Sequence, residues 1–250
     1  MKPRTVIDKA LQDRVAGARR VLAITGAGIS AESGIATFRG PDGWWRGRDP
    51  MTLASPEGFA ADPRLVWEWY LERRASIRAA EPNPAHLALA RLEGRLAGGG
   101  GELLVATQNV DGLHQRAGSR AVAEVHGSIW TVLCTATGRR YREGEVTVEG
   151  GPVPPVGPEG ALLRPGVVWF GEALPEEPIE RIETFLADPP DLALVIGTSA
   201  LFGYIVGWAL RARAAGATLI EINPERTELS FEADYFLQGK AGEILPSLID

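Results

Sequence analysis

Short apolar runs alternate with helical segments along this 250-residue chain. The alternation predicts an α/β fold with a Rossmann-like, doubly wound parallel sheet. The runs that we expect to be strands are 21–24, 103–106, 122–125, 192–197 and 218–223. Residues 131–160 break the alternation with short polar β-like pieces and then four prolines, which predicts a smaller inserted module.

Helices are expected where start and stop signals occur. Apolar residues four apart over 7–15 indicate a surface helix, and Asp62-Pro63 is an N-cap with a first-turn proline that begins a helix to residue 80. Prolines at 82 and 84 separate it from a helix over 85–96, and another helix covers about 204–215. We assign residues 1–38, 86–130 and 165–250 to the Rossmann-like domain and residues 39–85 and 131–164 to the small domain.

Composition and charge exclude several classes of protein. The chain is 45% hydrophobic and 23% charged, a globular balance, and its net charge of −6 argues against a nucleic-acid surface. The single cysteine, Cys134, rules out an internal disulfide and fits a reducing compartment. Residues 1–15 lack the apolar core of a signal peptide, and no segment reaches membrane-span length. We therefore expect a cytoplasmic protein with neither nucleic acid nor a membrane as partner.

The loop after the first strand organises the chain. Gly26 permits a tight turn, Gly28 lets the backbone approach a pyrophosphate closely, and the helix expected next offers its positive end to that anion. A Gly-x-Gly turn is also common as plain punctuation, and Ala31 stands where the dinucleotide fingerprint has its third glycine. Residues 36–45 contain glycine, proline and tryptophan, which cannot sustain the crossover helix of a plain Rossmann enzyme.

Gly26-Ala27-Gly28-Ile29-Ser30, continued as far as Phe38-Arg39, resembles the signature of the sirtuins, the NAD-dependent protein-lysine deacylases. Further motifs of that family follow in order, so the resemblance covers nearly the whole chain. It implies that the larger domain binds NAD, which is consumed as a co-substrate. The contacts that it implies around the first loop are Gly26, Ala27, Gly28, Ser30, Glu32, Thr37, Phe38, Arg39 and Trp45.

Residues 107–114, after the second predicted strand, match the sirtuin pattern without a gap. By resemblance, Gln108, Asn109 and Asp111 contact the nicotinamide and its ribose, and Asn109 and Asp111 take part in catalysis. An amide and a carboxylate at this place can hold an amide headgroup and stabilise a developing oxocarbenium ion. Each of these residues taken singly is also typical of a polar turn with capping side chains.

His126 ends the third predicted strand, next to Gly127, which gives backbone access. Its titration range suits a general base near neutral pH. The matching histidine of sirtuins deprotonates a ribose hydroxyl of the cofactor. We assign His86 and His114 to packing or capping, since a lone histidine is more often structural than catalytic.

The later strand ends and the segment 163–172 complete the resemblance. The family's contacts with the adenine, its ribose and the phosphates fall on Gly197, Thr198, Ser199, Asn223, Glu225 and Ala241. Its peptide-binding segment, which pairs with the substrate as an added strand, falls on Val168, Trp169, Phe170 and Gly171. For Val167 and Val168 a place in a hydrophobic core strand is also a reasonable reading.

Tyr70 and Arg73 are three residues apart and would share one face of a helix. An amphipathic helix with the aromatic residue inward and the arginine outward explains most such stretches. Tyr-x-x-Arg at this place also resembles the mark of the sirtuin branch that removes malonyl and succinyl groups. An acyl chain ending in a carboxylate needs a guanidinium and a hydroxyl donor in an otherwise apolar tunnel.

The small module departs from the family, whose structural zinc is commonly held by two Cys-x-x-Cys pairs. Cys134 stands at the first ligand position, but the other three fall on Thr137, Val156 and Glu159. These four residues do not make a tetrahedral zinc site. We therefore expect a degenerate, zinc-free module that resembles a zinc ribbon, holds no metal, and is stabilised by a small apolar core and by its prolines.

The resemblance implies an NAD-dependent protein-lysine deacylase, acting on succinyl, malonyl and also acetyl groups of acylated lysine side chains. In that family the acyl oxygen attacks the nicotinamide ribose, the histidine base activates a ribose hydroxyl, and nicotinamide and O-acyl-ADP-ribose are released. The alternatives are a mono-ADP-ribosyltransferase, a non-catalytic NAD sensor and a Rossmann dehydrogenase. The products formed from NAD and acyl-lysine peptides would distinguish them. The sequence leaves the protein targets and the oligomeric state open.

Overall fold

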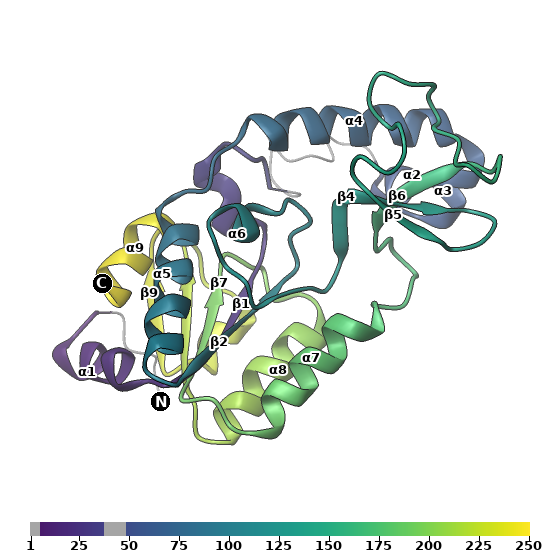
Figure 1. Cartoon of the computed structure of the whole chain (residues 1–250). Coiled ribbons are helices and arrows are strands. Elements are labelled where there is room, and N and C mark those ends of the chain that lie inside the picture. Colours follow the sequence, from purple (N-terminus) through teal and green to yellow (C-terminus); the bar gives the residue numbers. More distant parts are fainter. Residues whose placement is uncertain (1–5, 38–48) are drawn as a thin grey trace.

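The computed structural model describes residues 6–37 and 49–250. The chain forms a larger part around a parallel sheet and a smaller part around an antiparallel sheet (Figure 1). Helix α4 (Pro63–Ala79) reaches from the larger part across the smaller one. The C-terminus lies on the larger part (Figure 1).

Six strands within the described residues form a fully parallel sheet in the order β3-β2-β1-β7-β8-β9. They are β1 (Arg20–Thr25), β2 (Glu102–Thr107), β3 (Val122–Glu124), β7 (Leu192–Ile196), β8 (Thr218–Asn223) and β9 (Tyr235–Gln238). The order reverses between β1 and β7, which is the topological switch point of the sheet. Ligands bind there, outside the carboxyl ends of the strands, in open α/β sheets.

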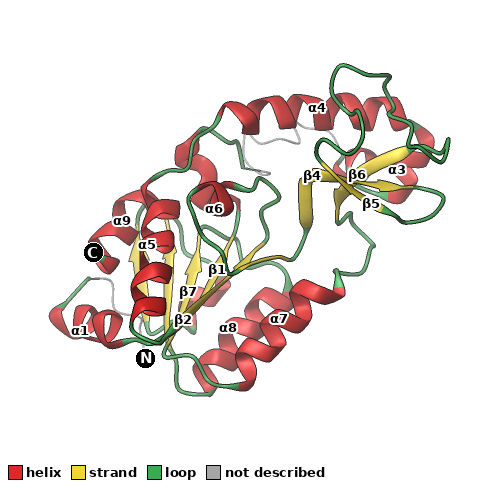
Figure 2. Ribbon diagram, in the orientation of Figure 1, coloured by secondary structure: helices red, strands yellow, loops and turns green. Residues whose placement is uncertain are grey.

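Helices cover both faces of this sheet (Figure 2). One face packs against α1 (Lys9–Gly17), α5 (Pro84–Gly98) and α9 (Ala241–Ile249), and the other against α7 (Glu176–Ala187) and α8 (Gly203–Ala214). Along β1, Val21 and Ala23 belong to the first apolar cluster, whereas Leu22 and Ile24 belong to the second. Burial on both faces explains why the strands are continuous apolar runs rather than alternating ones.

The predicted strands are all present, and the predicted helices lie within a few residues of the observed ones. Asp62 begins α4 as expected, since its carboxylate accepts a hydrogen bond from the Leu65 amide at 2.9 Å. A helix follows the first strand as expected, but it is a 3₁₀ helix of seven residues, η1 (Ala27–Ser33), which begins before Gly28 and ends at Gly34 with φ +81°. Elements missed from the sequence are α2 (Pro50–Leu53), α3 (Pro56–Ala61), α6 (Leu113–Arg116), α7, α9, β9 and η2 (Glu228–Phe231).

The smaller sheet has the order β5-β4-β6 in the described part of the chain, with antiparallel pairs throughout. Its strands are β4 (Gly127–Cys134), β5 (Arg140–Arg142) and β6 (Leu163–Val167). Val132, Cys134 and Leu163 belong to one apolar cluster with Trp67 and Trp69 of α4. The small module thus packs its core on α4, and β4 runs from the segment assigned to the larger domain into this module.

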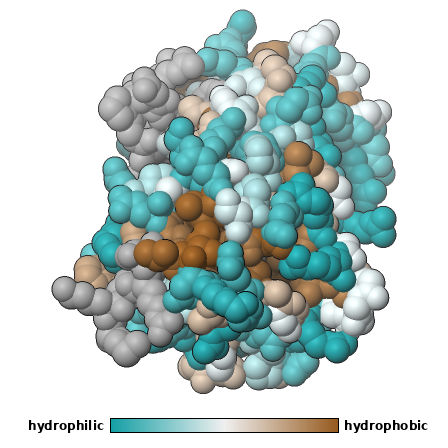
Figure 3. Space-filling model, turned by 90° about the vertical axis from the view of Figure 1, so that its left-hand side faces the viewer, coloured by the Kyte–Doolittle hydropathy of each residue, from teal (hydrophilic) through white to brown (hydrophobic). Residues whose placement is uncertain are grey.

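Most of the face that Figure 3 shows is hydrophilic. In the view of Figure 3, one hydrophobic patch lies in the middle of the face, between hydrophilic side chains above and below. No helix in residues 6–37 and 49–250 is both long and apolar enough to cross a bilayer.

Candidate active site

A cavity of about 1560 Å³ lies at the carboxyl ends of the parallel strands. The loops that follow β1, β2, β7 and β8 form one side of it, and the segment after β6 together with α4 forms the other. All strands of the large sheet are parallel, so their carboxyl ends meet at one edge and bring these loops together.

Most of the residues selected from the sequence line this cavity. From the predicted cofactor set they are Gly26, Ala27, Gly28, Glu32, Thr37, Gln108, Asn109, His126, Gly197, Thr198, Ser199, Asn223, Glu225 and Ala241. From the predicted substrate set they are Tyr70, Arg73, Val168, Trp169, Phe170 and Gly171. Ser30 and Asp111 are buried behind the lining. Phe38, Arg39 and Trp45 lie outside the described residues.

The loops after β1 and β7 touch backbone to backbone. The Gly28 amide donates to the Gly197 carbonyl at 2.8 Å, and a Cβ on Gly28 would lie 2.7 Å from the Gly197 Cα. Gly197 itself has φ +59°, and a Cβ there would lie 2.4 Å from the Ile29 nitrogen. The spacing of the glycines predicts room for a pyrophosphate, but in the structure Gly28 provides first of all the room for Gly197.

Side-chain amides and hydroxyls tie the same loops together. The Gln108 amide donates to the Thr198 hydroxyl at 2.9 Å, and the Asn223 amide donates to the Thr198 carbonyl at 2.8 Å. The Glu32 carboxylate accepts from the Gly242 amide at 2.7 Å, in the first turn of α9. The floor of the cavity is therefore a cross-linked set of loops rather than a group of independent turns.

Asp111 is the centre of a buried polar group behind the lining. Its carboxylate accepts hydrogen bonds from the Ser30 hydroxyl at 2.8 Å and from the Leu113 amide at 2.9 Å. The Asn109 amide donates to the same Ser30 hydroxyl at 3.1 Å. Burial raises the pKa of Asp111, and these hydrogen bonds and the nearby Arg73 charge oppose that rise. The three predicted residues Ser30, Asn109 and Asp111 thus form one hydrogen-bonded unit.

His126 lines the cavity between β3 and β4. Its Nδ1 lies 3.0 Å from the Gln108 carbonyl, which can only accept, so Nδ1 carries the proton of the neutral ring and Nε2 is left as the acceptor. Nε2 lies 2.5 Å from the Tyr204 hydroxyl, which donates to it. Burial lowers the pKa of His126 to about 4, against a smaller upward effect of the Gln108 carbonyl. The imidazole is therefore neutral at neutral pH and able to take up a proton.

The other two histidines have the structural parts expected of them. His86 accepts from the Asn83 amide at 3.3 Å in the capping box that begins α5, and its ring meets the His114 ring edge to face at 4.9 Å. The His114 Nε2 lies 3.0 Å from the Thr25 hydroxyl. Burial lowers the pKa of His86 to about 4 and that of His114 to about 3.

The wall opposite the loops is aromatic. The guanidinium of Arg73, only 4% exposed, lies 4.6 Å from the Trp69 ring centre and 5.3 Å from that of Tyr70. The Tyr70 hydroxyl accepts from the Trp169 indole at 3.0 Å and is also a hydrogen-bond partner of Arg73. Burial lowers the pKa of Arg73 and raises that of Tyr70. The expectation that an arginine here would point outward as on an ordinary amphipathic helix does not hold.

The backbone amides of the segment after β6 donate hydrogen bonds to other groups of this chain. Val168 donates to the His126 carbonyl at 2.8 Å, Trp169 to Glu172 at 2.8 Å, and Phe170 to the Ala54 carbonyl at 2.9 Å. In this arrangement a strand-like pairing with a peptide would rest on the carbonyl oxygens of the segment. Val167 belongs to β6 and to the apolar core of the small part, whereas Val168 follows the strand.

Comparison with known proteins decides the family. The model of the Sir2 family matches residues 26–202, which contain His126 and the loops after β1, β2 and β7. The chain belongs to the Sir2 family. It is 49% identical over 240 residues to NAD-dependent protein deacylase 2 of Pyrobaculum aerophilum, covering 95% of this chain and 93% of that one. It is 45% identical over 243 residues to NAD-dependent protein deacylase 1 of Archaeoglobus fulgidus, covering 97% of both.

Solved structures agree with this assignment to the Sir2 family. The crystal structure of a Sir2 homolog–NAD complex matches with a TM-score of 0.89 at 42% identity, over 100% of this chain and 95% of that one. A Sir2 structure with a deacetylated p53 peptide and 3′-O-acetyl ADP-ribose matches with a TM-score of 0.83 at 29% identity, over 95% of both chains. The sirtuin resemblance and the fold class predicted from the sequence are confirmed.

The four positions where the sequence comparison expects zinc ligands carry a cysteine, a threonine, a valine and a glutamate in this chain. Cys134 is hydrogen-bonded to Thr137, which lowers the pKa of its thiol, and it also interacts with Glu159. Glu159 in turn accepts a hydrogen bond from the Tyr141 hydroxyl, and Val156 is exposed. No three histidine, cysteine, aspartate or glutamate side chains gather as a metal site within the described residues. One thiol, one hydroxyl and one carboxylate do not fit a tetrahedral zinc.

Sequence reasoning missed several residues of this Sir2-family cavity. Tyr204, the partner of His126, and Phe202, whose ring lies 5.5 Å from the rings of both, come from the start of α8. Leu201 and Phe231 line the cavity while remaining 61% and 67% exposed. For Leu201, Phe202 and Tyr204 the sequence did offer a signal, which is the apolar and aromatic run shortly after Gly197-Thr198-Ser199. Such side chains at a strand end are open to a ligand.

Proposed function

We propose that this NAD-dependent protein deacylase of the Sir2 family acts best on acylated lysine side chains whose acyl group ends in a carboxylate, such as succinyl or malonyl, and also removes acetyl groups. The single observation that carries the proposal is the guanidinium of Arg73, buried in the aromatic wall of the cavity beside the Tyr70 hydroxyl. It lies on the same cavity as the neutral His126.

The chemistry of this wall favours a carboxylate. A guanidinium presents a rigid fork of donors that matches a carboxylate, and such charge-assisted bonds are stronger where water is excluded. Tyr70 is fixed by the Trp169 indole, and Trp169 is held by Arg164, whose guanidinium lies 3.5 Å from the centre of its ring. An acetyl group gains only the aromatic contacts of this wall, so a terminal carboxylate should raise the rate constant kcat/KM.

The loops at the strand ends supply the place for the co-substrate. When bound, NAD supplies the glycosidic bond to nicotinamide and the ribose hydroxyls on which deacylation depends. We assign Gln108, Asn109 and Asp111 to the nicotinamide side and the loops after β7 and β8 to the adenosine side. His126, neutral and with Nε2 as acceptor, takes up the proton of a ribose hydroxyl that replaces the Tyr204 hydroxyl at Nε2. A single ligand site usually measures about 300–1,000 Å³, so a larger cavity leaves room for both substrates.

The test compares matched peptides on matched variants. Arg73→Met should lower kcat/KM for a succinyl-lysine peptide by about 10–100-fold, because one hydrogen bond to a charged group is worth about 1.5–3 kcal/mol. It should leave kcat/KM for the acetyl peptide unchanged or raised, since the apolar side chain suits a methyl group. Tyr70→Phe should act in the same direction with a smaller effect.

Arg64→Met is the control, because Arg64 stands on the same helix but is exposed and pairs with Glu68 at 2.8 Å. It should leave kcat/KM unchanged for both the succinyl and the acetyl peptide. Equal losses on succinyl and acetyl peptides in Arg73→Met, or no loss on either, would mean that Arg73 is structural and that the proposed acyl preference is wrong.

A further inference from the structure

Trp130 connects the small sheet to the loop that carries Asp111. Trp130 stands on β4, and its indole Nε1 donates to the Asp111 carbonyl at 2.8 Å. The next residue, Gly112, has φ +76°, and a Cβ there would lie 3.1 Å from the same indole nitrogen. The indole therefore fits against the backbone at the point where the chain turns into α6.

This contact completes the set that orients Asp111. The carboxylate is held by Ser30 and by the Leu113 amide, while the carbonyl of the same residue is held by Trp130. Asp111 is only 5% exposed, so water offers little alternative for either group. Removing the indole donor would leave the carbonyl unsatisfied and free the backbone to rotate.

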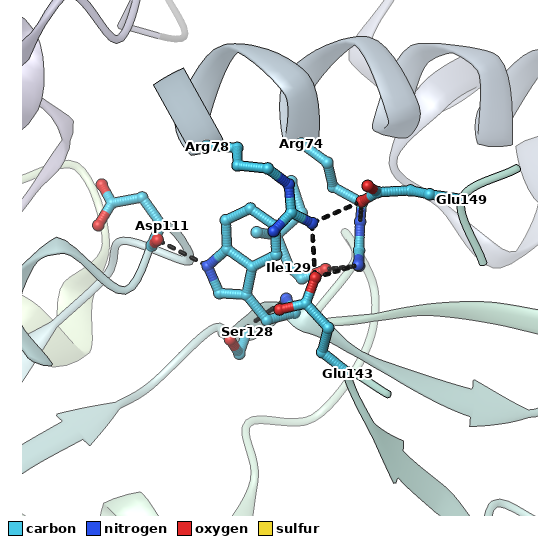
Figure 4. A network of polar contacts seen from close by, with 8 residues as sticks. Arg74, Arg78, Asp111, Ser128, Ile129, Glu143 and Glu149 are labelled. Atoms are coloured by element: carbon cyan, nitrogen blue, oxygen red, sulfur yellow. Dashed lines mark hydrogen bonds and ion pairs between the residues drawn. The ribbon is translucent and has the colours of Figure 1, made fainter. Parts of the chain in front are cut away.

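Two arginines pack against the Trp130 indole, and two glutamates pair with these arginines (Figure 4). Arg74 and Arg78 lie one turn apart on α4, with their guanidinium carbons 5.0 Å and 4.8 Å from the Trp130 ring centre. Glu143 and Glu149 come from the loop after β5, and each accepts from both arginines. We call Arg74, Arg78, Glu143 and Glu149 the Arg–Glu cluster.

The cluster joins the small module to α4. Arg74 is 2% exposed and donates to Glu149 at 2.8 Å and to the Ile129 carbonyl, next to Trp130, at 2.5 Å. Two arginines one turn apart repel each other unless carboxylates lie between them, and a buried guanidinium without its carboxylate is costly. The loop after β5 is therefore held where the two arginines keep the ring of Trp130 in place.

We propose that Trp130 is a positioning residue for Asp111, and that the Arg–Glu cluster keeps Trp130 in position, so that the small module controls the geometry of the nicotinamide side of the cavity. This inference rests on the proposed assignment of Asp111 to the nicotinamide ribose. Trp130 does not line the cavity. Its effect on the reaction passes through Asp111.

The first experiment removes one donor. Trp130→Phe keeps a six-membered aromatic ring under the two arginines and deletes the indole N–H with the pyrrole part of the ring. The loss of the donor should weaken NAD binding by about 3- to 10-fold, as expected for one neutral hydrogen bond. The dissociation constant is measured by calorimetry without peptide, and exchange of the amides around 109–113 with deuterium should become faster. Trp208→Phe is the control, because it deletes a matched indole donor on α8, whose acceptor is Glu183 of α7 at 3.0 Å. It should change neither readout.

The second experiment removes the carboxylates. Glu143→Gln with Glu149→Gln should lower the melting temperature by several degrees and weaken NAD binding about as much as Trp130→Phe. Glu68→Gln, which breaks the exposed pair on the same helix, should do neither. Combining the double variant with Trp130→Phe should add no further loss of NAD affinity, since both changes act through one ring.

Asp111→Asn separates the two proposals. If it leaves NAD affinity and nicotinamide exchange unchanged, the assignment of Asp111 fails, and the inference fails with it. If it impairs both while Trp130→Phe matches wild type, the assignment stands and the positioning role of Trp130 is wrong. If the losses of NAD affinity in Trp130→Phe and in the double glutamine variant add up when combined, the proposed coupling between Trp130 and the Arg–Glu cluster is wrong.

Discussion

The two sides of the cavity are built from different materials. The side formed by the loops after β1 and β7 is backbone against backbone, with Gly28 and Gly197 in contact. The side formed by α4 and the segment after β6 is aromatic side chains around the guanidinium of Arg73. The first has no room for an added methyl group, whereas the second can change its chemistry by exchanging one side chain. We infer that cofactor use is rigidly built in and that acyl preference is adjustable.

The largest effect should come from His126, which lies where the two sides meet and serves every acyl group. His126→Ala should lower the turnover of succinyl and acetyl peptides equally, by about 10²–10⁴-fold, because positioned acid–base catalysis contributes that much. NAD affinity should remain largely intact. Turnover close to wild type would remove His126 from the mechanism, and a loss on one substrate only would place it on the acyl side.

The rigidity of the loop side can be tested at Gly197. Gly197→Ala should cost about 1–3 kcal/mol in backbone strain at φ +59°, and its Cβ would also displace the backbone at Ile29. Both the melting temperature and the affinity for NAD should therefore fall. Gly94→Ala is the matched control, since no atom lies within 4 Å of its added Cβ and the glycine is within α5. It should be neutral or slightly stabilising. Equal outcomes in the two variants would contradict the comparison.

Tyr204 offers a smaller and more specific test. Its hydroxyl donates to the His126 Nε2 and so favours the neutral imidazole, and burial raises the pKa of Tyr204 to about 12, which keeps the donor protonated. Tyr204→Phe should raise the pKa of His126 from about 4 by about 0.5–1 unit. NMR titration of the imidazole should show this, while His86 and His114 serve as unchanged internal references.

The sign of the pH dependence follows from the protonation state that the base requires. His126 must be neutral to accept a proton, so the rate is lost as pH falls through its pKa in the folded protein. For wild type this lies near 4. In Tyr204→Phe the acid limb of kcat/KM should move to higher pH with the measured pKa. An unshifted limb beside a shifted pKa would show that another group controls the acid side.

Removal of metal ions should have no effect on this protein. Because Cys134, Thr137 and Glu159 are engaged with one another and Val156 is exposed, we expect the purified protein to contain no stoichiometric zinc. Chelators should leave activity and the melting temperature unchanged. Elemental analysis that finds one zinc per chain, lost together with folding on chelation, would show that the small module was misread.

The sequence by itself determined the parts that depend on local patterns. Continuous apolar runs mark strands buried on both faces, and Asp62-Pro63 marks a helix start, because caps and periodicity act between residues a few positions apart. The loop residues at the strand ends and His126 could be selected in the same way. Parallel strands end at one edge, so residues that follow different strands must meet there.

Only the tertiary structure decided what depends on contacts between distant segments. The hydrogen bonds from Trp169 to Tyr70, from Tyr204 to His126 and from Trp130 to Asp111 join residues 99, 78 and 19 positions apart on separate elements. No periodicity encodes such a pair, since each residue alone fits an ordinary helix or strand. The same holds for Gly28 and Gly197, where two separate turns each need a glycine because of the other. Packing between elements, which a linear pattern does not specify, sets these contacts.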